Sequence, residues 1–481
     1  MPAVSDSLFV AVGASLVVFV AISFGLAWWY RDRIHDAEDF LVAGRRLPLS
    51  LAWATLLATW FGAGTLLTAA DEIANGGLQR AALEPLGAGL CLILAGVLLA
   101  RPLWEMKLLT FGDFFGRRFG PRAELVSSLL MIPTYFGWVA VQFIALAGIL
   151  QLYLGIDPWL GMILVAAVGA GYTLMGGMWA VTMTDAVQLA LLLVGLLILG
   201  VQVLAHFGDG SAFDGLSALA DLLPPAMLEP VPTETASATF GWLSVLATSA
   251  LGNLAGQDLL QRIFAARDAK TAQRACGLAG ATYILAGSIP VMLGLAAAVS
   301  MPQVETSVVP ALAAAFLSPA TMVVFVVTIA AAVLSTIDGA LLAPASVFAK
   351  NVAPRLWPSD DGGPDLVRVT RICIVATAVI SLVLAWIGES AYGLLEDAYE
   401  LGFTCLVVPL VLGVHRSREQ GDAPAVAAML FGFATWVVHY AAGWETFGGP
   451  ALQAWSLPRA LTSVAIALAI YLVVGRRSAS Q

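Results

Sequence analysis

Charged residues are scarce in this sequence. Only 11% of its 481 residues are Asp, Glu, Lys or Arg, and no extended hydrophilic stretch remains for a soluble catalytic or sensory domain. The formal net charge of −9 therefore says little about affinity for nucleic acid or for acidic substrates. We expect no nucleic-acid partner.

Cysteine and histidine are also sparse. The four histidines are scattered and no HExxH pattern occurs, which weakens any interpretation as a metalloenzyme. We see no nucleophile–base pair either, and we expect a protein without enzymatic activity or an organic cofactor. The cysteines are isolated in or beside apolar runs, so we interpret them as small hydrophobic residues rather than a disulfide or metal framework: Cys91, Cys276, Cys373 and Cys405.

Apolar residues, by contrast, make up 60% of the chain, and the mean hydropathy is +0.89. Runs of roughly 20 apolar residues recur from end to end, which is typical of an all-α integral membrane protein in contact with lipid. The first run, Leu8 to Tyr30, is too long for a signal peptide and follows Asp6 rather than a basic segment, so we expect it to be retained. We count thirteen candidate spans, which begin near Leu8, Leu47, Leu78, Glu124, Pro158, Thr182, Phe240, Ala275, Ala320, Thr370, Ala391, Ala423 and Arg459.

The positive charges indicate an orientation. If the N-terminus is outside and the spans alternate, all of the 23 Lys and Arg residues except Arg80 and Arg459 fall on the cytoplasmic side. The loop from His206 to Thr239, on the opposite side, has no Lys or Arg. We therefore predict an outside N-terminus, a cytoplasmic C-terminus and, for a bacterial chain, location in the inner membrane.

The apolar run from Ala330 to Ser346 carries Ser335, Thr336 and Asp338 in its middle. Polar side chains at membrane depth are costly unless they line a cavity, bind an ion or find a partner. The alternative is that the hydroxyls bond to the preceding helical turn and that Asp338 lies near the water interface.

Two spans look interrupted. Leu47 to Ala70 has Gly62 and Gly64 at its midpoint, and Phe240 to Gln261 contains the polar patch Gly252 to Asp258. Glycines of this kind can also serve close helix packing alone. Weak points in corresponding positions of two halves, however, indicate a transporter built from inverted repeats, in which the unwound backbone coordinates ions.

Four segments resemble the solute:sodium symporter family. They are YTLMGGMWAVTMTDAVQ (Tyr172 to Gln188), GQDLLQRIFAARDAKTAQRA (Gly256 to Ala275), AAAVLSTIDGALLAPAS (Ala330 to Ser346) and LEDAYELGFTCLVVPLVLGV (Leu395 to Val414). The resemblance implies a leucine-transporter-type fold in a single membrane domain. It has an extra N-terminal helix (8–30), two inverted five-helix repeats (47–208 and 240–416) and two extra C-terminal helices (423–475).

The resemblance also implies a sodium site between the first and eighth core helices. Its ligands are the backbone carbonyls of Ala58, Phe61 and Ala332 and the side-chain oxygens of Ser335 and Thr336. Sodium is a hard cation that takes oxygen ligands, so carbonyls and hydroxyls suit it.

A second cation site is a further expectation from the resemblance, with Asp185 and Asp338 as its residues. Asp338 is a departure from the family pattern, which has small hydroxyl residues here in members with two sodium sites. Asp338 is therefore a sodium ligand, a proton carrier shared with Asp185, or an interfacial acid.

Candidates for substrate binding come from their placement near the midplane: Glu84, Gln142, Asn253, Gln257 and Tyr399. Glu84 lies in a segment that resembles the sugar-transporting branch of the family. The alternative is that Glu84 lies near the outer end of its helix and pairs with Arg80, one turn away. Trp60, Trp138 and Trp242 are candidates for a gate or for interface anchors.

Together these features predict a sodium-coupled symporter that imports a small polar organic solute by alternating access. Two alternatives stay open. One is proton coupling through Asp185 and Asp338, and the other is a transporter-like sensor that works with a separate partner.

Overall fold

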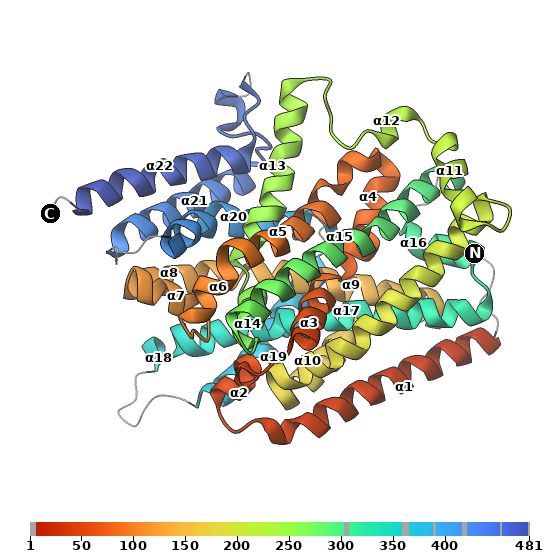
Figure 1. Ribbon diagram of the computed structural model, residues 1–481, viewed down its shortest axis with the longest axis horizontal. Helices are drawn as coiled ribbons and strands as arrows, with labels where there is room; N and C mark the ends of the chain where they lie inside the picture. The colour runs from red at the N-terminus through yellow and green to blue at the C-terminus, as the bar shows by residue number, and fades with distance from the viewer. Residues whose placement is uncertain are drawn as a thin grey trace.

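A computed structural model of the chain describes residues 6–302, 307–357, 365–387, 391–415, 421–452 and 455–479. All regular elements of this part of the chain are helices (Figure 1). In the first half, the α-helices are α1 (Asp6–Tyr30), α2 (Ala37–Val42), α3 (Leu49–Trp60), α4 (Ala69–Gly76), α5 (Ala88–Leu94), α6 (Ala100–Glu105), α7 (Phe111–Arg118), α8 (Pro121–Met131), α9 (Thr134–Leu154), α10 (Pro158–Phe207) and α11 (Ala212–Leu222).

The second half continues with α12 (Pro225–Leu228), α13 (Ala236–Gly252), α14 (Gln257–Ala265), α15 (Ala269–Ser300), α16 (Val308–Phe316), α17 (Pro319–Val347), α18 (Ala353–Leu356), α19 (Leu366–Ile387), α20 (Ala391–His415), α21 (Asp422–Ala442) and α22 (Arg459–Ala479). Short π-helical turns join several of them: Gly64–Thr68, Leu83–Gly87, Ala95–Leu99 and Phe348–Val352. The 3-10 turns are Arg31–Arg33, Ala43–Arg45, Gly77–Ala82, Asn253–Ala255 and Gly449–Ala451.

Ten helices among the described residues are long and apolar enough to cross a membrane. The prediction of thirteen spans is not tested by this number, because α10 alone covers two of the predicted spans and breaks at Gly177. Its 50 residues would measure about 75 Å, more than twice the thickness of a bilayer's hydrocarbon core. The two interrupted spans contribute segments such as α3 and α13, with 12 and 17 residues, which are too short to be counted.

The helices form one bundle with flanking helices at two opposite edges (Figure 1). At one edge α1 packs on α10 and α17, and at the other α21 and α22 pack on each other and on α20. Between them, α17 packs against α3, α9 and α10, while α15 packs against α3, α4 and α5. The predicted repeat boundaries stay predictions, and the predicted end at Arg416 lies outside the described residues.

The two interrupted spans are joined at one end. The amide of Leu47 donates to the carbonyl of Ala265 at 3.0 Å, and the amide of Arg267 donates to the carbonyl of Leu47, also at 3.0 Å. This pair of hydrogen bonds ties the segment before α3 to the residue that ends α14. The start of the first interrupted span and the end of the second therefore lie side by side.

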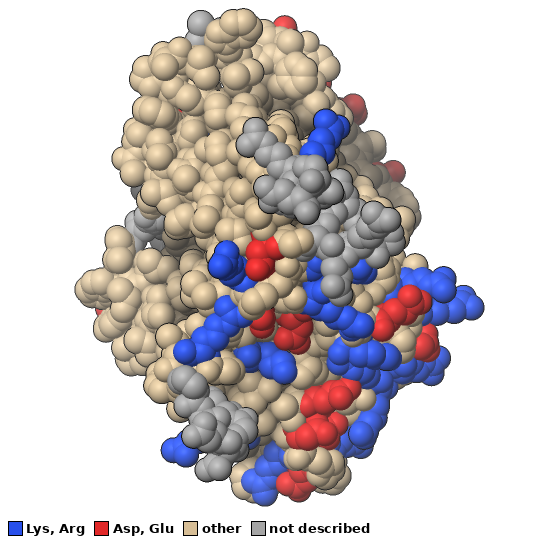
Figure 2. All heavy atoms as spheres, turned by 90° about the vertical axis from the view of Figure 1, so that its left-hand side faces the viewer, with Lys and Arg blue, Asp and Glu red and all other residues tan. Residues whose placement is uncertain are grey.

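Lys and Arg side chains gather on the face shown in Figure 2, which is the left-hand side of Figure 1, where the C-terminus lies. The rest of the molecule in this view is mostly uncharged. This distribution agrees with the asymmetry of positive charge along the sequence.

Gly177 offers a test of the break in α10. It has φ of 49°, and a Cβ there would lie 2.5 Å from the carbonyl oxygen of Phe40. Alanine at this position would have to adopt the same positive φ, and its Cβ would clash with the backbone of Phe40. We expect Gly177→Ala to lower the free energy of unfolding by about 1–3 kcal/mol, measured by thermal unfolding in detergent.

Gly148→Ala is the matched control. Gly148 lies in α9 with ordinary helical φ, and a Cβ there would meet nothing within 4 Å. We expect no loss of stability in this variant. Equal melting temperatures for the two variants would contradict the strained geometry at Gly177.

Candidate functional site

The first interruption lies between α3 and the π-helical turn Gly64–Thr68. Helix α3 ends at Trp60, and Phe61 leaves the helical region with φ of −89° and ψ of 66°. Side chains from neighbouring helices lie at the freed backbone groups. The amide of Ala63 donates to Oε1 of Gln142 at 2.9 Å, and the hydroxyl oxygen of Tyr283 lies 3.0 Å from the carbonyl oxygen of Trp60, with its one proton shared between Trp60 and Glu84. Such bonds are required where a helix opens at membrane depth.

Gly62 brings this break against α17. A Cβ at Gly62 would lie 2.4 Å from Oγ1 of Thr336 and 2.8 Å from Oε1 of Gln142. Only glycine fits such a close approach. The prediction that Gly62 interrupts this span is confirmed, and so is the prediction of a break in the second interrupted span, where α13 gives way to a 3-10 turn and then α14.

Four of the five residues predicted to bind sodium meet at this contact. Ser335 Oγ lies 2.9 Å from the carbonyl oxygen of Ala58 and 2.8 Å from that of Ala332, and Thr336 Oγ1 lies 3.1 Å from the same carbonyl of Ala332. Phe61 directly precedes Gly62, beside Thr336. The arrangement is a compact group of neutral oxygens, the donor set that a sodium ion prefers.

The back-bonding alternative from the sequence is partly present as well, because both hydroxyls donate to Ala332 in the preceding turn. The other half of that alternative is wrong. Asp338 has no exposed surface and lies inside the bundle rather than near an interface.

Asp185 is paired with Arg262. Its Oδ2 is 3.5 Å from Nη2 of Arg262 and also accepts the hydroxyl proton of Thr55. Arg262 is 1% exposed, and it donates to the carbonyl of Thr55 at 3.0 Å and to the hydroxyl of Thr59. From the sequence, Arg262 is grouped with the positive charges of the cytoplasmic loops, and that prediction of a loop position is wrong. Helix α14 continues past Gln261 to Ala265, and the guanidinium points to α3.

Asp338 faces the same buried region from α17. Neither of its carboxylate oxygens accepts a hydrogen bond of good geometry from the described residues, although the hydroxyl of Tyr172 and the amide of Gly339 lie close to it. Asp185 and Arg262 act on it electrostatically. The structure therefore brings the two predicted acids near each other and adds a fixed positive charge. The sequence holds one sign that Arg262 belongs to the helix rather than to a loop. It follows Asp258 by four residues, which puts both residues on one helical face.

Glu84 lies at the centre of a second polar cluster. It is 4% exposed; its Oε2 accepts from Thr65 at 3.1 Å and from Tyr283 at 2.5 Å, and its Oε1 accepts from Tyr399 at 3.0 Å. The alternative pairing with Arg80 is wrong, since Arg80 approaches Glu72 at 3.8 Å. Glu84 thus connects the first interrupted span with α15 and α20.

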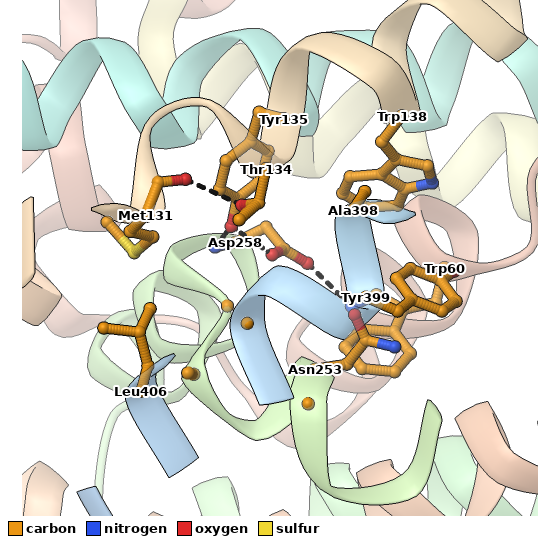
Figure 3. Close-up of a pocket in the computed structure, with 14 residues that line it drawn as sticks. Trp60, Met131, Thr134, Tyr135, Trp138, Asn253, Asp258, Ala398, Tyr399 and Leu406 are labelled. Carbon is orange, nitrogen blue, oxygen red and sulfur yellow. Dashed lines mark hydrogen bonds between the residues drawn. The ribbon is translucent and has the colours of Figure 1, made fainter. Parts of the chain in front are cut away.

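A cavity of about 40 Å³ lies between the two interruptions, α9 and α20 (Figure 3). Tyr399 and Asn253 line it, as do Trp60 and Trp138. Its volume holds only a few water molecules, so this conformation is too tight for an organic solute.

Three other residues proposed from the sequence do not line this cavity. Gln142 bonds to the backbone of Ala63, and Gln257 bonds to the amide of Phe111 at 2.6 Å and to Ser346 at 3.2 Å. Both side chains therefore lock helices together in this conformation. Trp242 donates to the carbonyl of Gln79 at 3.0 Å.

Asp258 also lines the cavity, although the sequence did not single it out as a binding residue. It is 3% exposed and is the second residue of α14. Its Oδ1 accepts from the hydroxyl of Tyr135 at 2.6 Å, and its Oδ2 accepts from the indole N–H of Trp60 at 2.8 Å (Figure 3). Asp258 was visible in the polar patch of the second interrupted span, but only the fold brings Trp60 and Tyr135 to it.

Solved structures identify the class of this fold. The chain superimposes on a substrate-bound outward-open Na⁺-coupled sialic acid symporter with a TM-score of 0.80 at 18% identity, covering 97% of this chain and 96% of that one. A nucleobase-cation-symport-1 family transporter in a closed conformation gives a TM-score of 0.61 at 15% identity, with 92% and 94% covered. The protein has the leucine-transporter-type fold of secondary transporters.

A family model then narrows the class. The model of the Sodium:solute symporter family matches residues 40–432, so the chain belongs to that family and is a multi-pass membrane transporter rather than an enzyme. The human High affinity choline transporter 1 is 27% identical over 413 residues, which are 82% of this chain and 70% of the relative. The High-affinity proline transporter PutP of Bacillus subtilis is 25% identical over 350 residues, with 70% and 72% covered.

The Asp185–Arg262 pair can be tested by removing one partner. Arg262→Gln leaves Asp185 buried beside Asp338 without a positive charge, and we expect a loss of about 3–5 kcal/mol in unfolding free energy. Asp185→Asn combined with Arg262→Gln should restore much of that stability, because neither position of the pair then carries a charge. Thermal unfolding of the purified variants measures both effects.

Arg101→Gln is the control for this prediction. Arg101 pairs with Glu105 at 3.0 Å, but both side chains are more than half exposed, so the expected change is below about 0.5 kcal/mol. An Arg262→Gln variant as stable as Arg101→Gln would contradict a structural role for the buried pair.

Proposed function

We propose that this protein is a sodium-coupled symporter that imports a small organic solute across the inner membrane of a bacterium, with its N-terminus outside and its C-terminus in the cytoplasm. Membership of the Sodium:solute symporter family supports sodium as the coupling ion. The gathering of Lys and Arg on one face supports the orientation (Figure 2).

The sodium ion binds between α3 and α17, at the carbonyls of Ala58, Phe61 and Ala332 and the hydroxyls of Ser335 and Thr336. The observation that carries this proposal is the approach of Ser335 Oγ to both Ala58 and Ala332. A sodium ion there would replace these internal hydrogen bonds with ion–oxygen contacts and hold the first interrupted span against α17. Loss of sodium would release that contact, which is how ion binding can bias alternating access.

Asp185 and Asp338 stay candidates for a second cation site. Arg262 changes the charge balance at these two acids, because its guanidinium lies 3.5 Å from Asp185 and already compensates its negative charge. A second cation must therefore compete with a tethered positive charge.

The solute binds at the cavity of Figure 3, with Asn253 and Tyr399 on its wall and Glu84 behind Tyr399. We take it to be a small organic cation. Asp258 has a buried carboxylate with two neutral donors, Tyr135 and Trp60, and no ion-pair partner among the described residues. Trp60, Tyr135, Trp138 and Tyr399 add aromatic faces of the kind that attract ammonium groups.

Several relatives are named as choline transporters, which supports a cationic solute, whereas others are named as proline and glucose transporters. Recognition of a methylated ammonium by aromatic rings needs no hydrogen bond from the cation, only ring faces and a negative charge. The cavity must widen before such a solute enters, since about 40 Å³ is too small.

Sodium binding is tested by thermal unfolding of the purified protein in sodium chloride against potassium chloride. A ligand at a hundredfold excess over its Kd stabilises the folded state by about 2.7 kcal/mol. We expect a sodium-specific rise in melting temperature that is lost in Ser335→Ala/Thr336→Ala. Ser288→Ala is the control, because Ser288 is exposed on α15 and donates only to the preceding turn.

A shift on acidification in place of a sodium shift, abolished by Asp185→Asn, would support proton coupling instead. The absence of a shift with either ion would favour the sensor that works with a separate partner. Each result selects one of the functions left open by the sequence.

The solute class is tested by uptake of radiolabelled choline into proteoliposomes under an inward sodium gradient, with proline as the uncharged comparison. We expect saturable, sodium-dependent choline uptake and little proline uptake. Asp258→Asn should lower choline kcat/KM by at least about tenfold, since about 1.4 kcal/mol of charge attraction is worth that factor. Sodium-dependent proline uptake with no choline uptake would refute the cation assignment while leaving sodium coupling intact.

A further inference from the structure

A cavity of about 400 Å³ lies between the α6–α7 loop, α7, the start of α8 and the π-helical turn Phe348–Val352. It shares no lining residue with the cavity of Figure 3. Helices α7 and α8 lie at the left-hand side of Figure 1, the side where Figure 2 shows Lys and Arg gathered. A volume of this size is in the range of sites for small organic molecules.

Two acidic side chains line the cavity, and each of their carboxylate oxygens already accepts a hydrogen bond. Oδ1 of Asp113 accepts from the carboxamide of Asn351 at 3.0 Å, and its Oδ2 accepts from the amide of Thr110 at 3.2 Å. Oε1 of Glu124 accepts from the same carboxamide at 2.8 Å, and its Oε2 accepts from Arg355, also at 2.8 Å. These bonds hold both acids to the protein and leave the basic residues of the cavity to a ligand.

Three basic side chains complete the charged lining: Lys107, Arg117 and Lys350. None of them forms an ion pair with an acidic side chain among the described residues. Arg117 donates one N–H to the carbonyl of Met106 at 2.8 Å and keeps its other guanidinium donors. Lys107 holds its ammonium group 3.0 Å from the ring centroid of Trp104. Lys107 and Arg117 are exposed and Lys350 is half-buried, so a ligand can reach all three.

The charge balance at the cavity favours an anion. The lining carries three basic and two acidic side chains, and Arg355 adds a further positive charge beside Glu124. Desolvation, and then the positive charge of Arg45, lower the pKa of Lys107. Glu38 acts in the opposite direction, but it is itself paired with Arg45 at 2.6 Å. A bound anion would therefore reduce the repulsion among these positive charges.

From this we infer a binding site for a phosphate group, carried by a soluble phosphate ester or by an anionic lipid, between Lys107, Arg117 and Lys350. The oxygens of a phosphate group point in different directions, and the three cations come from three separate segments, so each can bind a different oxygen. The ligand would connect the α6–α7 loop and α7 with the turn that follows α17, beside the bridge that Asn351 already makes. Binding would thus stabilise the present position of α17, the helix that carries the hydroxyls of the proposed sodium site. Its effect on transport rests on the proposed function, but the binding itself does not.

The experiment measures thermal unfolding of the full-length protein in detergent, with potassium as the only metal cation. Two probes are titrated at constant ionic strength: glycerol 3-phosphate for a soluble ester, and dioctanoyl phosphatidylglycerol for a lipid headgroup. We expect a saturable rise in melting temperature with at least one of them. Lys107→Gln/Lys350→Gln should raise the half-saturating concentration by at least about tenfold, because it removes two of the three charges and keeps side chains of similar size.

Lys270→Gln is the matched control, since it removes the same charge from an exposed lysine of α15 that does not line the cavity. It should leave the half-saturating concentration unchanged. Dioctanoylglycerol, which has the same chains and no phosphate, is the control for the lipid. An equal saturable shift with dioctanoylglycerol would overturn the phosphate assignment, because the chains alone would then explain the effect.

The pattern of shifts also identifies the source of the phosphate group. A rise with glycerol 3-phosphate assigns the site to a soluble ester, and a rise with the lipid alone assigns it to a headgroup. Two results would overturn the site: no shift with either probe, or the same half-saturating concentration in Lys107→Gln/Lys350→Gln as in the unmodified protein. Since neither sodium nor a transported solute is present, failure of this site leaves the proposed function intact, and failure of sodium coupling leaves this site intact.

Discussion

The fold depends on a constraint that the bilayer imposes: every backbone group freed by opening a helix needs a partner within the protein. At the first interruption, Gln142 and Tyr283 supply those partners to Ala63 and Trp60. The same opening leaves carbonyls such as that of Ala58 within reach of Ser335. The contacts that stabilise the break thus also bring together the oxygens of the proposed sodium site, and α9, α15 and α17 pack around them.

Buried charges obey the same constraint, because they also need partners within the protein. Asp185 and Arg262 compensate each other where both side chains are buried, and Thr55 and Thr59 accept further hydrogen bonds from Arg262. Because Arg262 comes from α14 and Asp185 from α10, their pairing connects the second interrupted span with the helices around the proposed sodium site. A buried pair of this kind adds little net stability, but loss of either partner is severe. It is therefore suited to enforcing one arrangement of the helices.

The two cavities show how one helix can serve two environments. Helix α20 presents Tyr399 to the cavity of Figure 3 and Asp397 to a second cavity between α8, α9, α19, α20 and α21, and Ala398 between them lines both. Successive residues of a helix point in different directions, about 100° apart. Thr134 and Ala398 therefore separate the cavity of Figure 3 from the one that opens between α8, α9, α19, α20 and α21.

The sequence by itself determined the class of protein, because long apolar runs, positive-charge asymmetry and glycine-marked interruptions are properties of local composition. It also marked Ser335, Thr336 and Asp338 as polar residues in the middle of an apolar run, and the family resemblance added Asp185. Only the tertiary structure decided their partners. Arg262 looked like a loop charge, Glu84 had Arg80 one turn away, and Asp258 had no visible role, yet the side chains that meet them come from α3, α9, α10, α15 and α20. Contacts between residues up to 315 positions apart are set by how helices pack, and no local pattern encodes that packing.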